Sequence, residues 1–219
     1  MTTDTLPHPP ARLSIDLPGG PPLLLLRPAR PEAIIDALTE LDADEKLPYW
    51  AELWPSSVGL AWALVEGRPD VRGLDVTELG CGVALVALAA ARAGARRVLA
   101  TDWYSECLDF ARASARENEL SLDTALLDWR RPTADAVADV VLAADVLYER
   151  RNAESVARAF DALVRPGGRA VVADPGRTYL NDLVEAMAGW RCERVTRAVR
   201  SPHIPTGAAE IHLLTFTRD

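Results

Sequence analysis

The chain lacks the features that mark membrane, secreted and zinc-binding proteins. It has no long apolar stretch free of charges, and its start, M-T-T-D-T-L-P-H-P-P, has neither the basic nor the apolar region of a secretory signal. Its three cysteines, Cys81, Cys107 and Cys192, are far apart and form no C-x-x-C pair, so the sequence predicts neither a disulfide framework nor a metal site. We therefore expect a cytoplasmic protein with no membrane partner.

Positive charge is also scarce. The formal net charge is −8, and Lys46 is the only lysine. An acidic protein repels the phosphate backbone of nucleic acid, so nucleic acid is not an expected partner, although a local basic patch stays open. With 219 residues, the chain is long enough for one α/β domain with a full core.

From residue 50 onwards the sequence alternates between apolar and amphipathic segments. Strand-like runs cover 74–79, 97–101, 122–127, 138–143 and 169–173, and helix-like segments cover 56–66, 84–93, 105–118, 153–164 and 179–188. This alternation predicts an α/β fold of Rossmann-like type, with a mostly parallel sheet and helices on both faces. The last two runs, 191–199 and 210–217, predict a C-terminal antiparallel hairpin, which brings the expected sheet to seven strands.

Residues 1–47 form an N-terminal extension in this prediction, and residues 48–219 form the α/β domain. The extension carries two apolar runs, 13–17 and 23–27, on either side of P-G-G-P-P, which predicts a β-hairpin or two edge strands. A short helix is expected at 31–41, because proline suits a first helical turn. We expect the extension to pack on the core.

The segment L-D-V-T-E-L-G-C-G-V-A-L, residues 74–85, predicts a strand that ends in a glycine turn and continues into a helix. Gly80 and Gly82 lack Cβ atoms, so the chain can turn tightly and bring its amides close to a ligand. Asp102 follows the next strand, where a carboxylate can accept hydrogen bonds from both hydroxyls of a ribose. A plain tight turn is the alternative. Together, the turn and the acid predict a site for a nucleotide-like ligand.

The residues around this turn favour S-adenosylmethionine over a dinucleotide. A dinucleotide fingerprint has a third glycine where this chain has Leu85. Glu78, at the strand end, would repel a pyrophosphate but suits a ligand with a cationic head. S-adenosylmethionine has an ammonium, a sulfonium and a ribose but no phosphate, so it fits this pattern.

Polar residues follow the later strands, at the edge of the sheet where a ligand is expected. Asp128 can accept a hydrogen bond from an adenine amino group and Trp129 can cover the ring, the alternative being a helix N-cap and a half-buried indole. Asp145 follows small residues at a strand tip, where the reacting group is expected. Asp174 and Arg177 flank a Pro-Gly turn that can project both into one cleft, or they form a solvated surface ion pair.

Three aromatic residues gather in P-Y-W-A-E-L-W-P, residues 48–55. They can form an apolar lid, and with Glu52 a channel that binds a cation through ring faces and charge. Core packing of Tyr49 or Trp50 is the alternative interpretation.

Four segments resemble the seven-β-strand class I methyltransferases, and among them the family-16 protein lysine methyltransferases. They are P-Y-W-A-E-L-W-P, E-L-G-C-G-V-A-L, A-T-D (100–102) with L-L-D-W (126–129), and A-D-V-L-Y (144–148), which matches the Asp-x-x-Tyr signature of that family. The resemblance implies that 48–219 is a class I methyltransferase domain. Ala84 departs from the pattern, since many methyltransferases have a third glycine there, and we expect the added methyl group to be tolerated.

The resemblance implies an S-adenosylmethionine-dependent methyltransferase that modifies lysine side chains of a protein partner. It implies that the cofactor is surrounded by Trp54, Glu78, Gly80, Gly82, Asp102, Asp128 and Trp129, and the neighbouring Cys81, Trp103 and Ala144 complete the expected cofactor-binding set. Asp145 and Tyr148 are the expected catalytic residues, at the lysine entrance.

The chemistry requires placement more than covalent help. A neutral amine attacks the sulfonium methyl in line, so Asp145 would orient the incoming ammonium and Tyr148 would supply an aromatic wall, while the proton can leave to water. Methyltransferases of nucleic-acid amino groups commonly carry Asn/Asp-Pro-Pro-Tyr, and this chain has D-V-L-Y without the prolines. Two alternative interpretations remain, a small-molecule methyltransferase and a non-catalytic cofactor-binding module, because both would share the cofactor half of the site.

Overall fold

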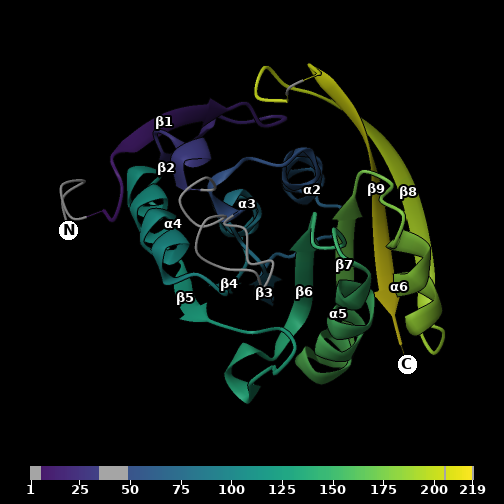
Figure 1. The fold of residues 1–219 in the computed structure, drawn as a ribbon. Helices are drawn as coiled ribbons and strands as arrows, with labels where there is room; N and C mark the ends of the chain where they lie inside the picture. The colour runs from purple at the N-terminus through teal and green to yellow at the C-terminus, as the bar shows by residue number, and fades with distance from the viewer. Residues whose placement is uncertain (1–5, 35–48, 205, 219) are drawn as a thin grey trace.

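The computed structural model describes residues 6–34, 49–204 and 206–218. Its centre is a seven-stranded sheet with the order β5-β4-β3-β6-β7-β9-β8 (Figure 1). The strands are β3 (Asp75–Leu79), β4 (Arg97–Asp102), β5 (Asp123–Leu126), β6 (Ala138–Ala144), β7 (Val164–Asp174), β8 (Arg191–Arg200) and β9 (Ala208–Thr217). Strands β3 to β7 run parallel, and β9 is antiparallel to β7 and β8. The predicted Rossmann-like α/β fold with a C-terminal hairpin is confirmed.

Helices cover both faces of the sheet, and the side-chain alternation of the strands explains why. In β6, Val140 and Leu142 are buried in the cluster that contains α2, α3 and α4, whereas Val141 and Ala143 are buried in the cluster that contains α5 and α6. A strand buried on both faces reads as a continuous apolar run. The helices are α2 (Pro55–Val65), α3 (Leu85–Arg92), α4 (Ser105–Glu117), α5 (Arg150–Leu163) and α6 (Leu180–Ala186), with 3₁₀ turns η2 (Tyr49–Ala51) and η3 (Ala134–Ala136). Within the described ranges, no helix has the length and apolar character needed to cross a bilayer.

The N-terminal hairpin forms a small sheet of its own, purple in Figure 1. Strands β1 (Pro10–Ile15) and β2 (Leu23–Pro28) pair antiparallel around P-G-G-P-P, as predicted. The hairpin is fixed to α4, since the amide of Leu26 donates to Ser114 Oγ (2.8 Å) and the amide of Leu24 donates to Asn118 Oδ1 (3.0 Å). The expected helix at 31–41 lies outside the described residues beyond residue 34, as does the expected boundary at 47/48, so both stay predictions.

β7 is longer than the run 169–173 expected from the sequence. It begins at Val164, which pairs with Ala138, and regular pairing resumes at Arg169 opposite Val140 after a register shift. Gly167 lies inside the irregular stretch with φ +74°, a conformation that glycine adopts without a steric penalty. The segment R-P-G-G therefore forms a bulge in a continuing strand rather than a separate loop.

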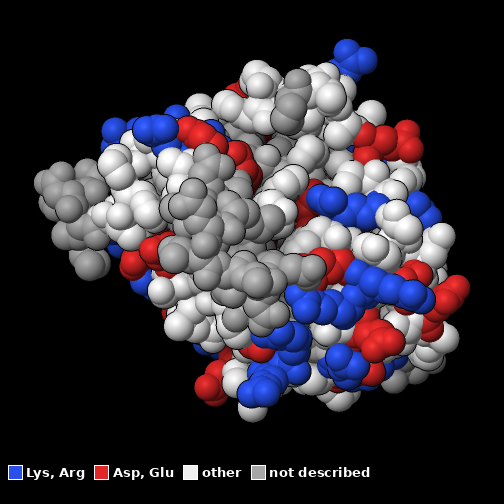
Figure 2. All heavy atoms as spheres, viewed as in Figure 1, with Lys and Arg blue, Asp and Glu red and all other residues white. Residues whose placement is uncertain are grey.

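The carboxyl ends of β3, β4 and β6 meet at the point where the strand order reverses. From β3 the chain continues to β4 on one side, while β6 lies on the other. In open α/β sheets this switch point is where ligands bind. Figure 2 shows the described surface in the same view, with basic and acidic side chains interspersed toward the lower right, the region of α5 in Figure 1.

Candidate active site

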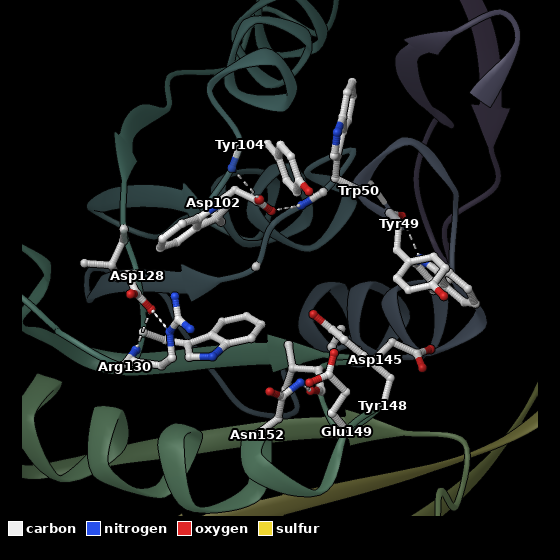
Figure 3. A pocket seen from close by; sticks show the side chains of 18 of the residues that line it. Tyr49, Trp50, Asp102, Tyr104, Asp128, Arg130, Asp145, Tyr148, Glu149 and Asn152 are labelled. Atoms are coloured by element: carbon white, nitrogen blue, oxygen red, sulfur yellow. Dashed lines mark hydrogen bonds and ion pairs between the residues drawn. The ribbon is translucent and has the colours of Figure 1, made fainter. Parts of the chain in front are cut away.

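A cavity of about 640 Å³ opens at the switch point (Figure 3). Small-molecule sites occupy about 300–1,000 Å³, so the cavity has the size of a ligand site. It is lined by Tyr49, Trp50, Trp54, Gly80, Gly82, Asp102, Trp103, Tyr104, Leu127, Asp128, Trp129, Arg130, Ala144, Asp145, Val146, Tyr148, Glu149, Arg151, Asn152 and Arg177. Most residues predicted for the site from the sequence are therefore brought to one cavity.

The glycine turn after β3 forms one wall of the cavity. Gly80 and Gly82 have φ values of +67° and +50°, in the left-handed region that favours glycine. A Cβ atom on Gly82 would lie 3.2 Å from the carbonyl oxygen of Trp50, and one on Gly80 would lie 2.8 Å from the ring of Trp129. Ala84 also has a positive φ, +62°, so the residue that departs from the glycine pattern adds backbone strain as well as a methyl group.

Asp102, at the end of β4, is fixed by the backbone on either side of it. Its Oδ2 atom accepts a hydrogen bond from the amide of Gly82 (3.0 Å) and its Oδ1 atom accepts one from the amide of Tyr104 (3.1 Å), as Figure 3 shows. Burial raises the pKa of this carboxyl, and the backbone amides only partly offset that effect. Each carboxylate oxygen has two lone pairs, so Asp102 can accept further hydrogen bonds from a ligand in the cavity.

The segment after β5 supplies a polar and aromatic wall. Asp128 accepts hydrogen bonds from the amide (3.0 Å) and Nε (2.8 Å) of Arg130, so it holds a turn rather than capping a helix. Burial raises the pKa of Asp128, but the bonds from Arg130 outweigh burial and lower it overall. Trp129 is half-buried, and the Arg130 guanidinium lies 5.0 Å from the ring centroid of the exposed Trp103. These flat rings and the carboxylate suit a planar heterocycle that carries an amino group.

Asp145 lies beyond the end of β6, at the opposite side of the cavity from Asp128 (Figure 3). It has φ +61° and is 6% exposed. Its Oδ1 atom accepts hydrogen bonds from Nε (2.8 Å) and Nη2 (2.5 Å) of Arg177, whereas its buried Oδ2 atom has no hydrogen-bond partner in the described part of the chain. The Arg177 guanidinium lies 5.7 Å from the ring centroid of Trp54.

An aromatic cluster stands beside Asp145. Tyr49 makes edge contacts with Trp54 (centroids 5.9 Å apart) and with Tyr148 (5.8 Å). Burial and the neighbouring Glu149 raise the pKa of Tyr148 to about 12, so its hydroxyl stays protonated near neutral pH. Trp50, by contrast, is buried against Phe110, so the core-packing interpretation holds for that ring even though it also reaches the cavity.

The prediction that both Asp174 and Arg177 project into the cleft is half right. Asp174 is fully buried and does not line the cavity, because its Oδ1 atom accepts the amides of Gly176 (2.7 Å) and Arg177 (2.6 Å). Burial raises the pKa of Asp174. Asp174 therefore shapes the turn, and Arg177 is the residue that reaches the cavity.

Glu78 was expected at the cofactor, but its side chain lies on the other side of the strand end, under α3. Its Oε2 atom accepts a hydrogen bond from the amide of Ala87 (2.8 Å), it is 1% exposed, and it does not line the cavity. Burial raises its pKa well above the ordinary value, with the Asp102 charge adding to the effect. Glu78 therefore anchors the start of α3 behind the glycine turn.

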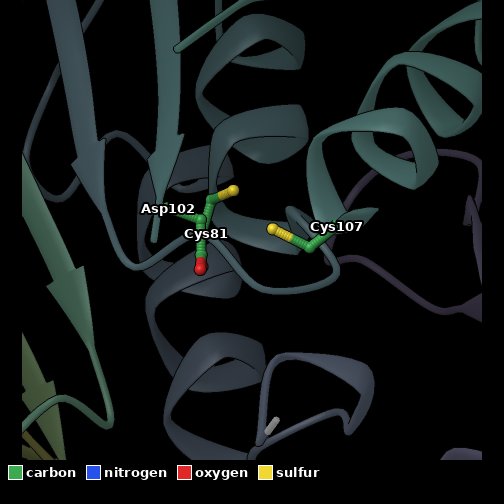
Figure 4. A group of neighbouring side chains, drawn as sticks. All are labelled: Cys81, Asp102 and Cys107. Atoms are coloured by element: carbon green, nitrogen blue, oxygen red, sulfur yellow. The ribbon is translucent and has the colours of Figure 1, made fainter. Parts of the chain in front are cut away.

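Cys81 was also expected at the cofactor, and its side chain does not line the cavity either. Cys81, Cys107 and Asp102 instead form a buried group whose ligand-type atoms lie within 4.8 Å of one another (Figure 4). The hydrogen bond with Cys107 lowers the pKa of Cys81, but burial and the nearby carboxylates outweigh it and raise that pKa to about 11. Burial also raises the pKa of Cys107. The two cysteines, distant in the sequence, therefore meet in space as buried thiols beside Asp102.

Carboxylates at the cavity have arginine partners that the sequence did not reveal. The pairs are Asp128–Arg130 (2.8 Å), Glu149–Arg151 (2.5 Å) and Asp145–Arg177 (2.5 Å). Glu52, expected in a cation channel, pairs with Arg27 at 2.6 Å and does not line the cavity. The site is therefore closer to electrical neutrality than the acidic composition suggests.

Sequence reasoning also missed Tyr104, Arg130, Arg151 and Asn152 among the lining residues. Asn152 donates from Nδ2 to the carbonyl oxygen of Val146 (2.9 Å) and so fixes the loop that carries Asp145. A signal existed for Tyr104 and Arg130, because each directly follows a predicted Asp-Trp pair in the sequence, Asp102–Trp103 and Asp128–Trp129.

Residues 77–172 match a family model described as a methyltransferase domain. The mouse histone-arginine methyltransferase METTL23 is 32% identical over 114 residues, 49% of this chain and 45% of the relative. The ubiquinone biosynthesis O-methyltransferase of Methylocella silvestris is 36% identical over 122 residues (52% and 47%). The mouse electron transfer flavoprotein beta subunit lysine methyltransferase is 29% identical over 131 residues (59% and 51%). The chain spans about half the length of these curated relatives.

Solved structures agree with the fold. The ribosomal protein L11 methylase of Lactobacillus delbrueckii subsp. bulgaricus has a TM-score of 0.57 and 23% identity, covering 74% of this chain and 78% of its own. The family model, this fold and the glycine turn at the switch point agree with the resemblance found in the sequence. S-adenosylmethionine is the cofactor of such a domain. Residues 77–172 therefore belong to a methyltransferase domain of the class I, S-adenosylmethionine-binding type.

Proposed function

We propose that this protein is an enzyme that transfers methyl groups from S-adenosylmethionine to lysine side chains of a protein substrate. The observation that carries the proposal is the buried Oδ2 atom of Asp145, which has no hydrogen-bond partner among the described residues and sits on a residue that lines a cavity rich in aromatic rings. An unpartnered buried acceptor is costly unless a ligand completes it. A lysine amino group can do so, because it donates N–H bonds while its stem packs against aromatic rings.

The residues at the other side of the cavity fit the cofactor. Asp102 would hold the ribose hydroxyls, because its oxygens are fixed by backbone amides and keep free lone pairs. Trp103 and Trp129 offer flat surfaces to the purine, and Asp128 is an acceptor for its amino group. A Cβ atom on Gly80 would meet the ring of Trp129 and one on Gly82 would meet the carbonyl oxygen of Trp50, so glycine is required at both positions of this cavity wall. When bound, the cofactor supplies an electrophilic methyl group on a sulfonium.

Asp145 and Tyr148 would act on the acceptor rather than on the nucleoside. Asp145 accepts an N–H bond through Oδ2 and orients the amine, and Tyr148 forms a wall for the lysine stem together with Tyr49. The proton that the lysine must lose can pass to water. Asp145 is therefore a positioning acceptor and is not required to act as a base.

The relatives supply support of a different kind. One of them is a lysine methyltransferase of the electron transfer flavoprotein beta subunit, which makes that subunit the first candidate substrate. A second, METTL23, is named as a histone-arginine methyltransferase, so both of these relatives are named for protein substrates. The similarity to a ubiquinone biosynthesis O-methyltransferase favours a second candidate, a small-molecule methyltransferase that would share the cofactor half of the site.

The proposal is tested by incubating the purified chain with isotopically labelled S-adenosylmethionine and either the flavoprotein beta subunit or lysate of the source organism. We expect label in protein, with mass spectrometry placing the added methyl groups on lysine side chains. Asp145→Asn should abolish transfer while the affinity for S-adenosylhomocysteine, measured by calorimetry, stays within about threefold, because the substitution touches the acceptor side alone. Label found only in small metabolites would favour the second candidate, and equal loss of binding and transfer would make Asp145 a cofactor ligand.

A further inference from the structure

The side chain of Arg177 lies where it cancels the charge of Asp145 without using all of that carboxylate. Nε and Nη2 of Arg177 both donate to Oδ1, at 2.8 and 2.5 Å, and neither reaches Oδ2 within hydrogen-bond distance. Guanidinium groups commonly engage both oxygens of a carboxylate. The arrangement therefore leaves the buried Oδ2 atom of Asp145, a residue that lines the cavity, without a hydrogen-bond partner among the described residues.

Both the backbone and the guanidinium of Arg177 are held in place. The backbone amide of Arg177 donates to Asp174 Oδ1 (2.6 Å), which fixes the turn that carries the residue. The guanidinium lies 5.7 Å from the ring centroid of Trp54, and the side chain is 31% exposed. Two independent contacts therefore keep the charge of Arg177 next to Asp145.

The protonation state of an acceptor amine at Asp145 should respond to this charge. A like charge within about 4–6 Å disfavours the protonated form of an amine and lowers its pKa. A neutral amine donates one N–H bond to Oδ2 and brings no second positive charge, whereas an ammonium adds a cation beside the guanidinium. The lone pair must also be free, because it forms the N–CH₃ bond while the C–S bond breaks and its electron pair stays on sulfur.

We propose that Arg177 is a specificity-determining residue that selects the neutral form of the acceptor amine at Asp145. This inference rests on the proposed function, because it assumes that the reactive end of the cofactor lies toward Asp145. Arg177 does not need to contact the transferred methyl group. It acts by holding Oδ1 and by opposing a second cation.

The test uses binding of two ligands and does not need an identified protein substrate. S-adenosylhomocysteine lacks the methyl group, and sinefungin carries a primary amine in the place of the sulfonium and its methyl, so the ratio of their affinities reports on a cation at this position. Near neutral pH, Arg177→Gln should favour sinefungin over S-adenosylhomocysteine by about tenfold relative to the unmodified protein, since an opposing charge is lost. Arg177→Lys keeps the positive charge but loses the two-donor contact with Oδ1, so it should change the ratio less than Arg177→Gln does.

Arg197 provides a matched control. It pairs with Glu66 at 2.6 Å and lies 5.5 Å from the ring centroid of Trp62, the same combination of carboxylate and indole, but it does not line the cavity. Arg197→Gln should leave the affinity ratio unchanged. Thermal melting of each variant checks that it is folded.

A second measurement needs no variant. In the unmodified protein, the affinity for sinefungin relative to S-adenosylhomocysteine should rise with pH, by up to about tenfold per unit below the pKa of the ligand's amine. A ratio that falls with pH, or one that Arg177→Gln leaves unchanged while S-adenosylhomocysteine still binds, would overturn the inference. If neither ligand binds the unmodified protein, the cofactor assignment itself is wrong and the inference falls with it.

Discussion

Replacement of Asp102 by asparagine separates the cofactor role of this residue from its structural role. The side chain keeps its size and one acceptor oxygen, but it loses the charge and places an NH₂ group opposite the amide of either Gly82 or Tyr104. A hydrogen bond from a ligand hydroxyl to a charged acceptor contributes about 1.5–3 kcal/mol. Since about 1.4 kcal/mol is a factor of ten, the affinity for S-adenosylhomocysteine should fall about 10- to 150-fold.

The effect on folding should be much smaller. One backbone amide loses its acceptor, which is destabilising, but a buried carboxylate whose pKa is raised by burial also disappears, and the two effects oppose each other. We expect the free energy of unfolding to change by about 1 kcal/mol or less, in either direction.

Calorimetric titration measures the affinity for S-adenosylhomocysteine, and chemical denaturation of the same preparations measures the free energy of unfolding. Asp75→Asn is the control. Asp75 is a partly buried carboxylate held by Arg96 (2.9 Å) and Arg165 (3.0 Å), but it lies at the start of β3, at the end of the strand away from the cavity. That variant should alter stability and leave the affinity unchanged. Unchanged ligand affinity in Asp102→Asn would refute the ribose assignment.

Two further predictions follow from the glycine turn and its support. Gly82→Ala should lower the free energy of unfolding by about 1–2 kcal/mol because of its φ of +50°, and further because the new Cβ atom would lie 3.2 Å from the Trp50 carbonyl oxygen. Gly19→Ala is the control, since Gly19 has φ +70° with nothing within 4 Å of a Cβ atom, and it should show the backbone cost alone. Equal losses of unfolding free energy in the two variants, measured with denaturant, would contradict the steric argument. Glu78→Gln should become more stable than the unmodified protein as the pH rises from about 5 to about 8. Burial raises the pKa of Glu78 in the folded state, so the folded protein keeps a proton that the unfolded chain releases, and the unmodified protein loses stability with rising pH. A difference in melting temperature between the two proteins that does not change with pH would contradict this pKa argument.

The fold was largely predictable because its determinants are local. The apolar runs that became β3, β4 and β6 are buried on both faces, and the glycine turn lies where its conformation requires glycine. The start of β7 was missed because R-P-G-G resembles a loop, and only the pairing of Val164 with Ala138 makes it strand.

The candidate site was less predictable, for two physical reasons. Strand residues alternate between faces, and Glu78 falls on the α3 face, so its proximity to the turn in sequence did not bring its carboxylate into the cavity. The partner of Asp145 comes from the end of a different strand, and nothing near Asp145 in the sequence indicates Arg177. Sequence reasoning had placed Arg177 in the cleft but without a partner.

The arginine pairs change the physical basis for choosing an acceptor. In the sequence, Glu52 and Asp145 suggested that carboxylates at the cavity would attract a cationic substrate. Arginines neutralise three of those carboxylates locally, and a field screened over about 10 Å depends on the nearest charges rather than on the total. We therefore expect selection of the acceptor to depend on short-range features, namely Asp145 Oδ2, which has no hydrogen-bond partner in the described part of the chain, and the aromatic rings beside it. Under the proposed function, these features favour an amine that arrives neutral and is held by one hydrogen bond and ring contacts, and we expect the acceptor to be recognised by its shape and its donor rather than by its charge.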